Sequence, residues 1–217
     1  EGSDYSTLAN ITIPAGSLTG TTSFTPTDDA VYEGSENAVI SISNVTGGTV
    51  TENCTQEVTI SITDNESAPQ VSLRSSSSNI GQSAAPSLTL TATLSGVTDV
   101  DIIVGLSTSG TGTEGSDYET IPDITISAGQ TTGTTKLILS EDSIYEGNET
   151  AVIAIDGITG GVATVNASEE PITLTLTENE SAPTVTLTSS DTTVIEGSSL
   201  TVTATLTVAT IEDVTVT

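Results

Sequence analysis

Apolar and polar residues alternate strictly in several stretches of the chain. In residues 88–94 and again in residues 200–206, every second residue is apolar and the residues between them are threonines. A period of two predicts β-strands that bury one face. Turn signals such as Pro14-Ala15-Gly16 and Gly160-Gly161 separate these stretches. About seven short strands in roughly 110 residues are typical of an antiparallel β-sandwich, so the predicted fold is all-β.

The chain also repeats itself at an interval of 113 or 114 residues. Glu1-Gly2-Ser3-Asp4-Tyr5 returns at 114–118, where all five residues are the same. The block at 28–34 returns at 141–147, and the block at 64–69 returns at 178–183. A repeat of this length is a whole small domain and not a solenoid unit.

Ser-Ala-Pro sequences mark the expected domain boundaries. Residues 1–69 correspond to the C-terminal part of one domain, residues 70–182 to a complete domain, and residues 183–217 to the N-terminal strands of a further domain. The linkers between these parts are very short, so neighbouring domains are expected to stack as a stiff rod.

The two incomplete parts add up to a second domain that lacks only a connector equivalent to Gly105–Thr113. Two explanations fit this observation. The chain is a slice of a longer covalent array, which the shortness of the connector favours. Alternatively, separate chains join head to tail, and the late strands of one chain complete the early strands of the next. The expected partners are therefore neighbouring copies of the same repeat.

The charge of the chain narrows the possible functions. There are 29 acidic residues against two basic ones, Arg74 and Lys136, which gives a net charge of −27. This charge excludes electrostatic attraction to nucleic acid or to anionic lipid and favours cation binding. No stretch approaches the roughly 20 apolar residues of a membrane helix. An enzyme is not expected, because the chain has no histidine that could activate its single cysteine, Cys54.

The repeated acidic blocks are the most specific signal in the chain. They are a Gly-Ser-Asp-Tyr block, an Asp-Asp-x-x-Tyr-Glu-Gly-x-Glu block that begins at Asp28, and a closing Asp-Asn-Glu that begins at Asp64. In this order the blocks resemble the Calx-beta family, the calcium-binding β-sandwich first recognised in sodium–calcium exchangers. The resemblance covers essentially the whole chain. It implies seven-stranded, immunoglobulin-like sandwiches that bind Ca²⁺ through loops at one end, near the junction with the neighbouring domain.

The resemblance also implies two sets of metal ligands. Calcium prefers six to eight oxygen ligands, and clustered carboxylates repel one another unless a cation lies between them. One domain is split between residues 1–69 and residues 183–217, and its implied ligands are Asp4, Asp28, Asp29, Glu33, Asp64, Glu66 and Glu196. In the central domain they are Asp117, Glu141, Asp142, Glu146, Glu178 and Glu180. A single Asp-x-Glu sequence is better explained by solvated loop carboxylates, but three blocks repeated at one offset favour calcium.

The two sites are not expected to be equal. Where the central domain should match Glu196 it has Asn79-Ile80-Gly81, and it replaces two aspartates by glutamates at Glu141 and Glu178. Its site is therefore expected to be weaker or to hold fewer ions. Glu36 and Glu149, the last acidic residues of the long blocks, are expected to face solvent.

The predicted function is that of a calcium-binding structural segment in an extracellular fibre or cell-surface adhesin, with a prokaryotic surface as the expected location. Outside cells calcium is millimolar, so sites of modest affinity stay filled. The alternative is a calcium-sensing regulatory module of a membrane transporter or receptor, which would need adjacent membrane segments. Aromatic residues are nearly absent, so the sequence indicates no carbohydrate or peptide pocket and no adhesion target.

Overall fold

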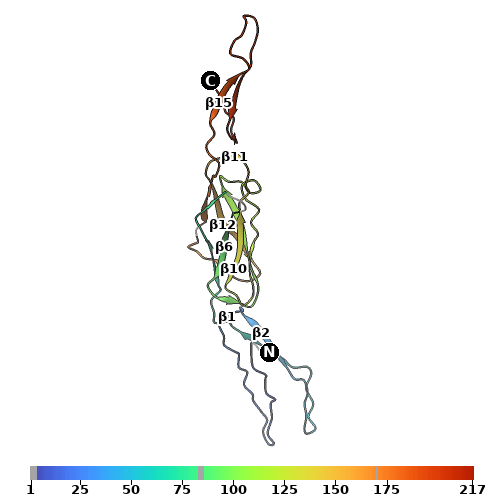
Figure 1. Ribbon diagram of the computed structural model, residues 1–217. Helices are drawn as coiled ribbons and strands as arrows, with labels where there is room; N and C mark the ends of the chain where they lie inside the picture. Colours follow the sequence, from blue (N-terminus) through green and yellow to red (C-terminus); the bar gives the residue numbers. More distant parts are fainter. Residues whose placement is uncertain (1–3, 83–85, 170) are drawn as a thin grey trace.

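The computed structural model describes residues 4–82, 86–169 and 171–217. Within these residues the protein is all-β and has no helix, so none is present that is long and apolar enough to cross a membrane. Figure 1 shows a rod: one complete sandwich lies in the middle, the N-terminal segment extends from one end, and the C-terminal segment extends from the other. This arrangement agrees with the stacking that the short linkers predict.

The central sandwich is built from two sheets that face each other. The first sheet has the order β10-β6-β4-β13. Its strands are β4 (Gln70–Ser75), β6 (Ser87–Leu94), β10 (Thr132–Ile138) and β13 (Thr164–Val165). The second sheet has the order β5-β14-β12-β8-β9. Its strands are β5 (Asn79–Gly81), β8 (Ile102–Gly110), β9 (Ile124–Ile126), β12 (Glu149–Thr159) and β14 (Ile172–Thr177).

The long strands are antiparallel, as the sequence predicts, but the sandwich also contains two short parallel pairs. β5 runs parallel to β14, and β13 runs parallel to β4. The chain crosses from the first sheet to the second between β4 and β5, so one continuous segment, residues 70–81, contributes to both sheets.

The apolar positions of the alternating stretches form the core between the sheets. Leu88, Leu90, Ala92 and Leu94 of β6 are all buried, while the threonines between them point away from the core. Facing residues of β8 and β14 are equally buried. Tyr118 is the largest fully buried side chain in the described residues, so it packs in the core. Burial of this apolar surface is the main favourable term in folding of the domain.

The two terminal segments contain shorter pieces of sheet. The N-terminal segment contains β1 (Val31–Tyr32) and a hairpin of β2 (Glu36–Ser41) and β3 (Glu57–Ile62). The C-terminal segment contains a hairpin of β15 (Val185–Ser189) and β16 (Val202–Leu206), followed by β17 (Ala209–Thr210). Both hairpins are antiparallel.

The junctions between the parts are themselves short β-ladders. β1 pairs in parallel with β7 (Val97–Thr98) of the central domain. In the same way, β11 (Ile144–Tyr145) of the central domain pairs in parallel with β17. Since β11 repeats β1 and β17 repeats β7, one junction geometry occurs twice along the rod (Figure 1). Successive domains are therefore held by backbone pairing as well as by their linkers.

Candidate metal centres

The three repeated acidic blocks meet at one end of the central domain. The backbone N–H of Ser140, next to the long block, donates to the carbonyl oxygen of Asp117 at 2.9 Å. The backbone N–H groups of Glu146 and Gly147 donate to Oε2 of Glu178, at 2.7 and 3.0 Å. These bonds tie together segments that are far apart in the sequence.

The N-terminal segment repeats the same bonds. The N–H of Thr27 donates to the carbonyl oxygen of Asp4 at 2.8 Å. The N–H groups of Glu33 and Gly34 both donate to Oδ2 of Asp64, each at 2.7 Å. The blocks that the sequence singles out are therefore brought together in both repeats.

A glycine in the left-handed region shapes the turn in each long block. Gly34 and Gly147 both have φ of 79° and directly follow Glu33 and Glu146. Residues with a Cβ rarely adopt this conformation, whereas glycine does so at little cost. In each block the next glutamate, two residues after the glycine, lies near the glutamate that precedes the glycine.

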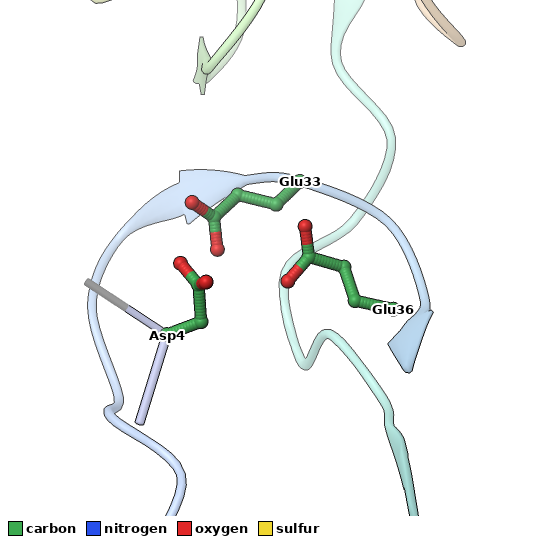
Figure 2. A group of neighbouring side chains, drawn as sticks. All are labelled: Asp4, Glu33 and Glu36. Carbon is green, nitrogen blue, oxygen red and sulfur yellow. The ribbon is translucent and has the colours of Figure 1, made fainter. Parts of the chain in front are cut away.

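Two clusters of three carboxylates result. In the central domain, one oxygen each from Asp117, Glu146 and Glu149 lies within 4.8 Å of the others. Asp117 is only 7% exposed, and the two glutamates are half-buried. In the N-terminal segment, Asp4, Glu33 and Glu36 form the equivalent cluster. Figure 2 shows their three carboxylates pointing toward one another.

The expectation that Glu36 and Glu149 face solvent is wrong. Both side chains are half-buried and belong to the clusters. The signal that could have found them is strand alternation. Glu36 stands two residues before the buried Ala38 in β2, and Glu149 stands two residues before the buried Ala151 in β12. A period of two therefore places each glutamate on the inward face of its strand.

Burial and uncompensated negative charge both raise pKa values in the central cluster. Burial, followed by the charges of Asp117 and Glu146, raises the pKa of Glu149 to about 7. Burial, followed by the charges of Asp117 and Asp142, also raises the pKa of Glu146. Each carboxylate makes ionisation of its neighbours less favourable, and a bound cation would relieve this repulsion.

The N-terminal cluster shows the same perturbation. Burial, followed by the charges of Asp29 and Asp4, raises the pKa of Glu33. Asp99, which directly follows β7 in the next domain, adds to this shift. Asp99 is not among the residues that the sequence predicts for this site, because its approach to Glu33 depends on how two domains dock. The equivalent position at the second junction is Ile211, so this feature is not repeated.

Asp64 and Glu178 behave differently from the clustered carboxylates. The backbone N–H of Glu66, followed by those of Gly34 and Glu33, lowers the pKa of Asp64 to about 2. Burial opposes ionisation of Glu178, but the N–H groups of Glu146 and Glu180 lower its pKa to about 2. Both side chains are therefore firmly ionised and hold the turn in place. Glu178 makes the contacts of Asp64 despite its extra methylene group.

Glu66 and Glu180 lie directly beside these anchors. A hydrogen bond with the neighbouring side chain, Asp64 or Glu178, raises the pKa of each of them. Both glutamates are half-buried. They stand next to the clusters, where a carboxylate could reach a bound ion.

The paired acids at the start of each long block are exposed. Asp29 accepts the N–H of Val31 at 2.8 Å, and Asp142 accepts the N–H of Ile144 at 2.7 Å. Asp28 accepts the side-chain amide of Asn65 at 2.9 Å. Glu141 makes the equivalent contact with Asn179 at 3.3 Å.

One cavity gathers the predicted residues of the N-terminal segment. It has a volume of about 240 Å³. The acidic residues that line it are Asp4, Asp28, Asp29, Glu33, Glu36, Asp64 and Glu66. Glu196 lies between β15 and β16, at the other end of the rod (Figure 1), so one chain does not bring it to this cavity.

The chemistry of the clusters fits a hard cation. Each cluster consists of carboxylates, which are the oxygen ligands that calcium prefers, with no histidine or cysteine.

A model of the Calx-beta domain family matches residues 1–66 and 83–180. The chain belongs to the Calx-beta domain family. The resemblance inferred from the acidic blocks is confirmed, and so is the β-sandwich fold. Calx-beta domains typically bind calcium, and their fold is non-catalytic.

One solved structure that matches is a crystal structure of the apo form of a Calx CBD1 domain. It is 11% identical to this chain, covers 51% of this chain and 99% of its own, and superposes with a TM-score of 0.42. No curated protein matches the chain.

Proposed function

We propose that this Calx-beta chain is a calcium-binding structural segment of an extracellular fibre or cell-surface adhesin, in which calcium at the domain ends stiffens the junctions. The observation that carries the proposal is the position of the clusters. Glu33 directly follows β1, and Glu146 directly follows β11. Each of these strands pairs with the next domain. A cation held by either cluster would therefore lie beside a domain junction.

The residues divide into two roles under this proposal. The clustered carboxylates would bind the ion, and Asp64 and Glu178 hold the turn that presents them. The ligands that we assign to the N-terminal site are Asp4, Asp28, Asp29, Glu33, Glu36 and Glu66, with Glu196 supplied from a neighbouring copy. Those that we assign to the central site are Asp117, Glu141, Asp142, Glu146, Glu149 and Glu180. When bound, calcium supplies the positive charge that offsets their repulsion.

The effect on rigidity follows from the same charges. Without a cation, Glu33 and Asp99 repel each other from opposite sides of the first junction. The ladder of β1 and β7 is only two residues long, so this repulsion destabilises it readily. Calcium would remove the repulsion and leave the ladder closed.

An extracellular location suits both the charge and the site. A net charge of −27 is compatible with a cation-rich exterior. Calcium sites of extracellular modules work with dissociation constants on the order of 10⁻⁴–10⁻³ M. A calcium-sensing module of a transporter or receptor would use the same ion chemistry. The repetition of one junction along the rod favours a structural array over such a sensor.

Small-angle X-ray scattering tests the proposal. We expect the maximum dimension of the particle to be sharply defined in millimolar calcium, and the distribution of dimensions to broaden when the calcium is chelated. The double variant Glu146→Gln/Glu149→Gln should broaden in calcium, whereas Asp156→Asn, an exposed acid on β12, should behave as the parent protein does. Identical scattering with calcium and with chelator would contradict the stiffening role.

A further inference from the structure

Gln82, directly after β5 in the central domain, has a side-chain oxygen without a hydrogen-bond donor. This oxygen is buried and accepts no hydrogen bond from the described residues. The backbone N–H of Gln82 donates to the carbonyl oxygen of Thr177 at 3.0 Å, so the main chain at this position is fixed in the ladder with β14. A buried acceptor that lacks a donor is unfavourable, and most buried polar atoms of folded proteins have a partner. The oxygen of Gln82 is therefore available to a ligand.

The side chain of Gln82 lies on the inward face of its segment. Ile80, two residues earlier, is 7% exposed, whereas Asn79 and Gly81 are exposed. A period of two places Gln82 on the same side of the chain as Ile80. Gln82 is itself half-buried. It therefore continues the inward row of β5 beyond the last apolar residue.

The neighbours of Gln82 on that face are carboxylates. In the parallel register of β5 and β14, Ile80 stands opposite Leu176. The same register carried two residues further sets Gln82 opposite Glu178. On the other side of β14, Leu176 stands opposite Glu149 of β12. Because neighbouring strands lie about 4.8 Å apart, Gln82 starts one strand spacing from Glu178 and two from Glu149, a member of the central cluster.

The C-terminal segment repeats this local structure with a glutamate in place of Gln82. Asn79 and Thr193 both donate their backbone N–H to the side chain two residues earlier, at 3.2 and 3.1 Å. These two turns stand 114 residues apart, which is also the interval between the closing acidic blocks. At the same interval Gln82 corresponds to Glu196, the glutamate predicted as a ligand of the other site. Gln82 has the length of a glutamate without its charge.

We propose that Gln82 binds the calcium ion of the central site through its side-chain carbonyl oxygen, as a neutral ligand beside Asp117, Glu146 and Glu149. Calcium accepts the amide carbonyl of glutamine as well as carboxylates. The ionised carboxylates nearby only accept hydrogen bonds, so they offer the oxygen of Gln82 no donor. A neutral ligand also adds no negative charge to a cluster whose members already repel one another. This inference rests on the proposed function, because it needs calcium at the central cluster.

Titration calorimetry of the full chain with calcium chloride tests the contribution of Gln82 to affinity. The background is Glu33→Gln/Glu36→Gln, which removes two carboxylates from the N-terminal cluster so that the central site dominates the titration. Since the number and charge of the ligands set calcium affinity, we expect Gln82→Leu to weaken binding about tenfold and Gln82→Glu to tighten it about tenfold. The matched control is Gln130→Leu, at an exposed glutamine of the same domain, which should bind as the background does.

Nuclear magnetic resonance shows whether the oxygen itself binds the ion. The chain has four glutamines, Gln56, Gln70, Gln82 and Gln130, so selective ¹³C and ¹⁵N labelling of glutamine gives four side-chain amide signals. The signal that Gln82→Leu removes belongs to Gln82. A cation on the amide oxygen withdraws electron density from the carbonyl carbon, so calcium should shift the ¹³Cδ resonance of Gln82 downfield and leave the other three in place. A residue that only supports the fold would not show this selective shift.

The two measurements separate this inference from the proposed function. A shift confined to Gln82, together with weaker binding by Gln82→Leu than by the control, is the expected result. Calcium binding with an unmoved ¹³Cδ resonance, or with Gln82→Leu as tight as the control, would overturn the role of Gln82 and leave the calcium proposal standing. Absence of calcium binding in the parent protein would overturn both. If Gln82→Leu does not fold, Gln82→Glu decides, and calcium binding no tighter than that of the background would count against a ligand at this position.

Discussion

Tyr32 and Thr98 stand opposite each other in the two-residue ladder that joins the N-terminal segment to the central domain. Tyr145 and Thr210 stand in the same relationship at the next junction. Thr98 is 2% exposed, and its hydroxyl donates to the carbonyl oxygen of Val100, which fixes the turn after β7. An acidic residue, Glu33 or Glu146, follows each tyrosine, so strand pairing and ion chemistry lie side by side at both junctions.

The central cluster should account for the calcium response of the central domain. Glu146→Gln/Glu149→Gln removes two of its three carboxylates and keeps the shape of both side chains. We expect the double variant to lose most of the increase in melting temperature that calcium gives this domain. Differential scanning calorimetry measures the loss, and Asp156→Asn serves as the control. A full calcium response in the double variant would place the ion elsewhere.

The cluster should also make the metal-free domain sensitive to pH. Glu149 has a pKa of about 7 in the folded protein against an ordinary value of 4.5. Between these values the folded state retains a proton that the unfolded state has released, so stability falls as the pH rises. The slope contributed by Glu149 is at most about 1.4 kcal/mol per pH unit.

Melting in chelator at pH 5.5 and pH 7.5 checks this sign. Glu149→Gln should flatten the dependence and raise the melting temperature at pH 7.5 in the absence of metal, although it weakens calcium binding. Below pH 4.5 the direction reverses, because Glu178, whose pKa is about 2 in the folded protein, loses its stabilising charge as it is protonated. A variant as pH-sensitive as the parent would count against Glu149.

Asp64 and Glu178, the carboxylates that hold the two turns, should stabilise the fold even without calcium. Glu178 accepts the N–H groups of Glu146 and Gly147, and hydrogen bonds to a charged group contribute about 1.5–3 kcal/mol. Glu178→Ala should therefore lower the free energy of unfolding of the central domain by about this amount in chelator. Denaturant titration measures the change. If Glu178→Ala destabilised only the calcium-bound form, Glu178 would be a ligand and not an anchor.

The two sites should differ in affinity when a neighbouring repeat supplies Glu196 to the N-terminal site. The N-terminal site then gains Glu196, whereas the central domain has Asn79-Ile80-Gly81 followed by the uncharged Gln82 at the matching positions. Titration calorimetry of a tandem fusion, in which a connector copied from Gly105–Thr113 joins one copy to the next, should resolve two classes of site, and Glu196→Gln should weaken the tighter one at least tenfold. A single class of sites, unchanged by Glu196→Gln, would show that Glu196 takes no part.

Much of this architecture can be predicted from local patterns. Strict alternation in residues 88–94 predicts which residues of β6 are buried, because the pleat of a strand decides the face. The repeated blocks predict that Asp117, Glu146 and Glu178 come together, because equal spacing in two domains implies one shared geometry.

Other features depend on contacts that the sequence does not contain locally. The ladder of β1 and β7 is only two residues long and joins separate domains, so no periodicity marks it. The approach of Asp99 to Glu33 follows from that docking alone. The prediction that Glu149 faces solvent fails for another reason. Acidic residues are usually solvated, but strand alternation places Glu149 on the same face of β12 as the buried Ala151.

Calcium should bind the folded Calx-beta domains at these clusters and not the unfolded chain. Differential scanning calorimetry in 10 mM calcium chloride and in chelator, at constant ionic strength, tests it directly. For a site with a dissociation constant near 0.1 mM, mass action predicts stabilisation by about 2.7 kcal/mol, which is a shift of roughly 10 °C or more for a domain of this size. Equal melting temperatures under both conditions would contradict the account.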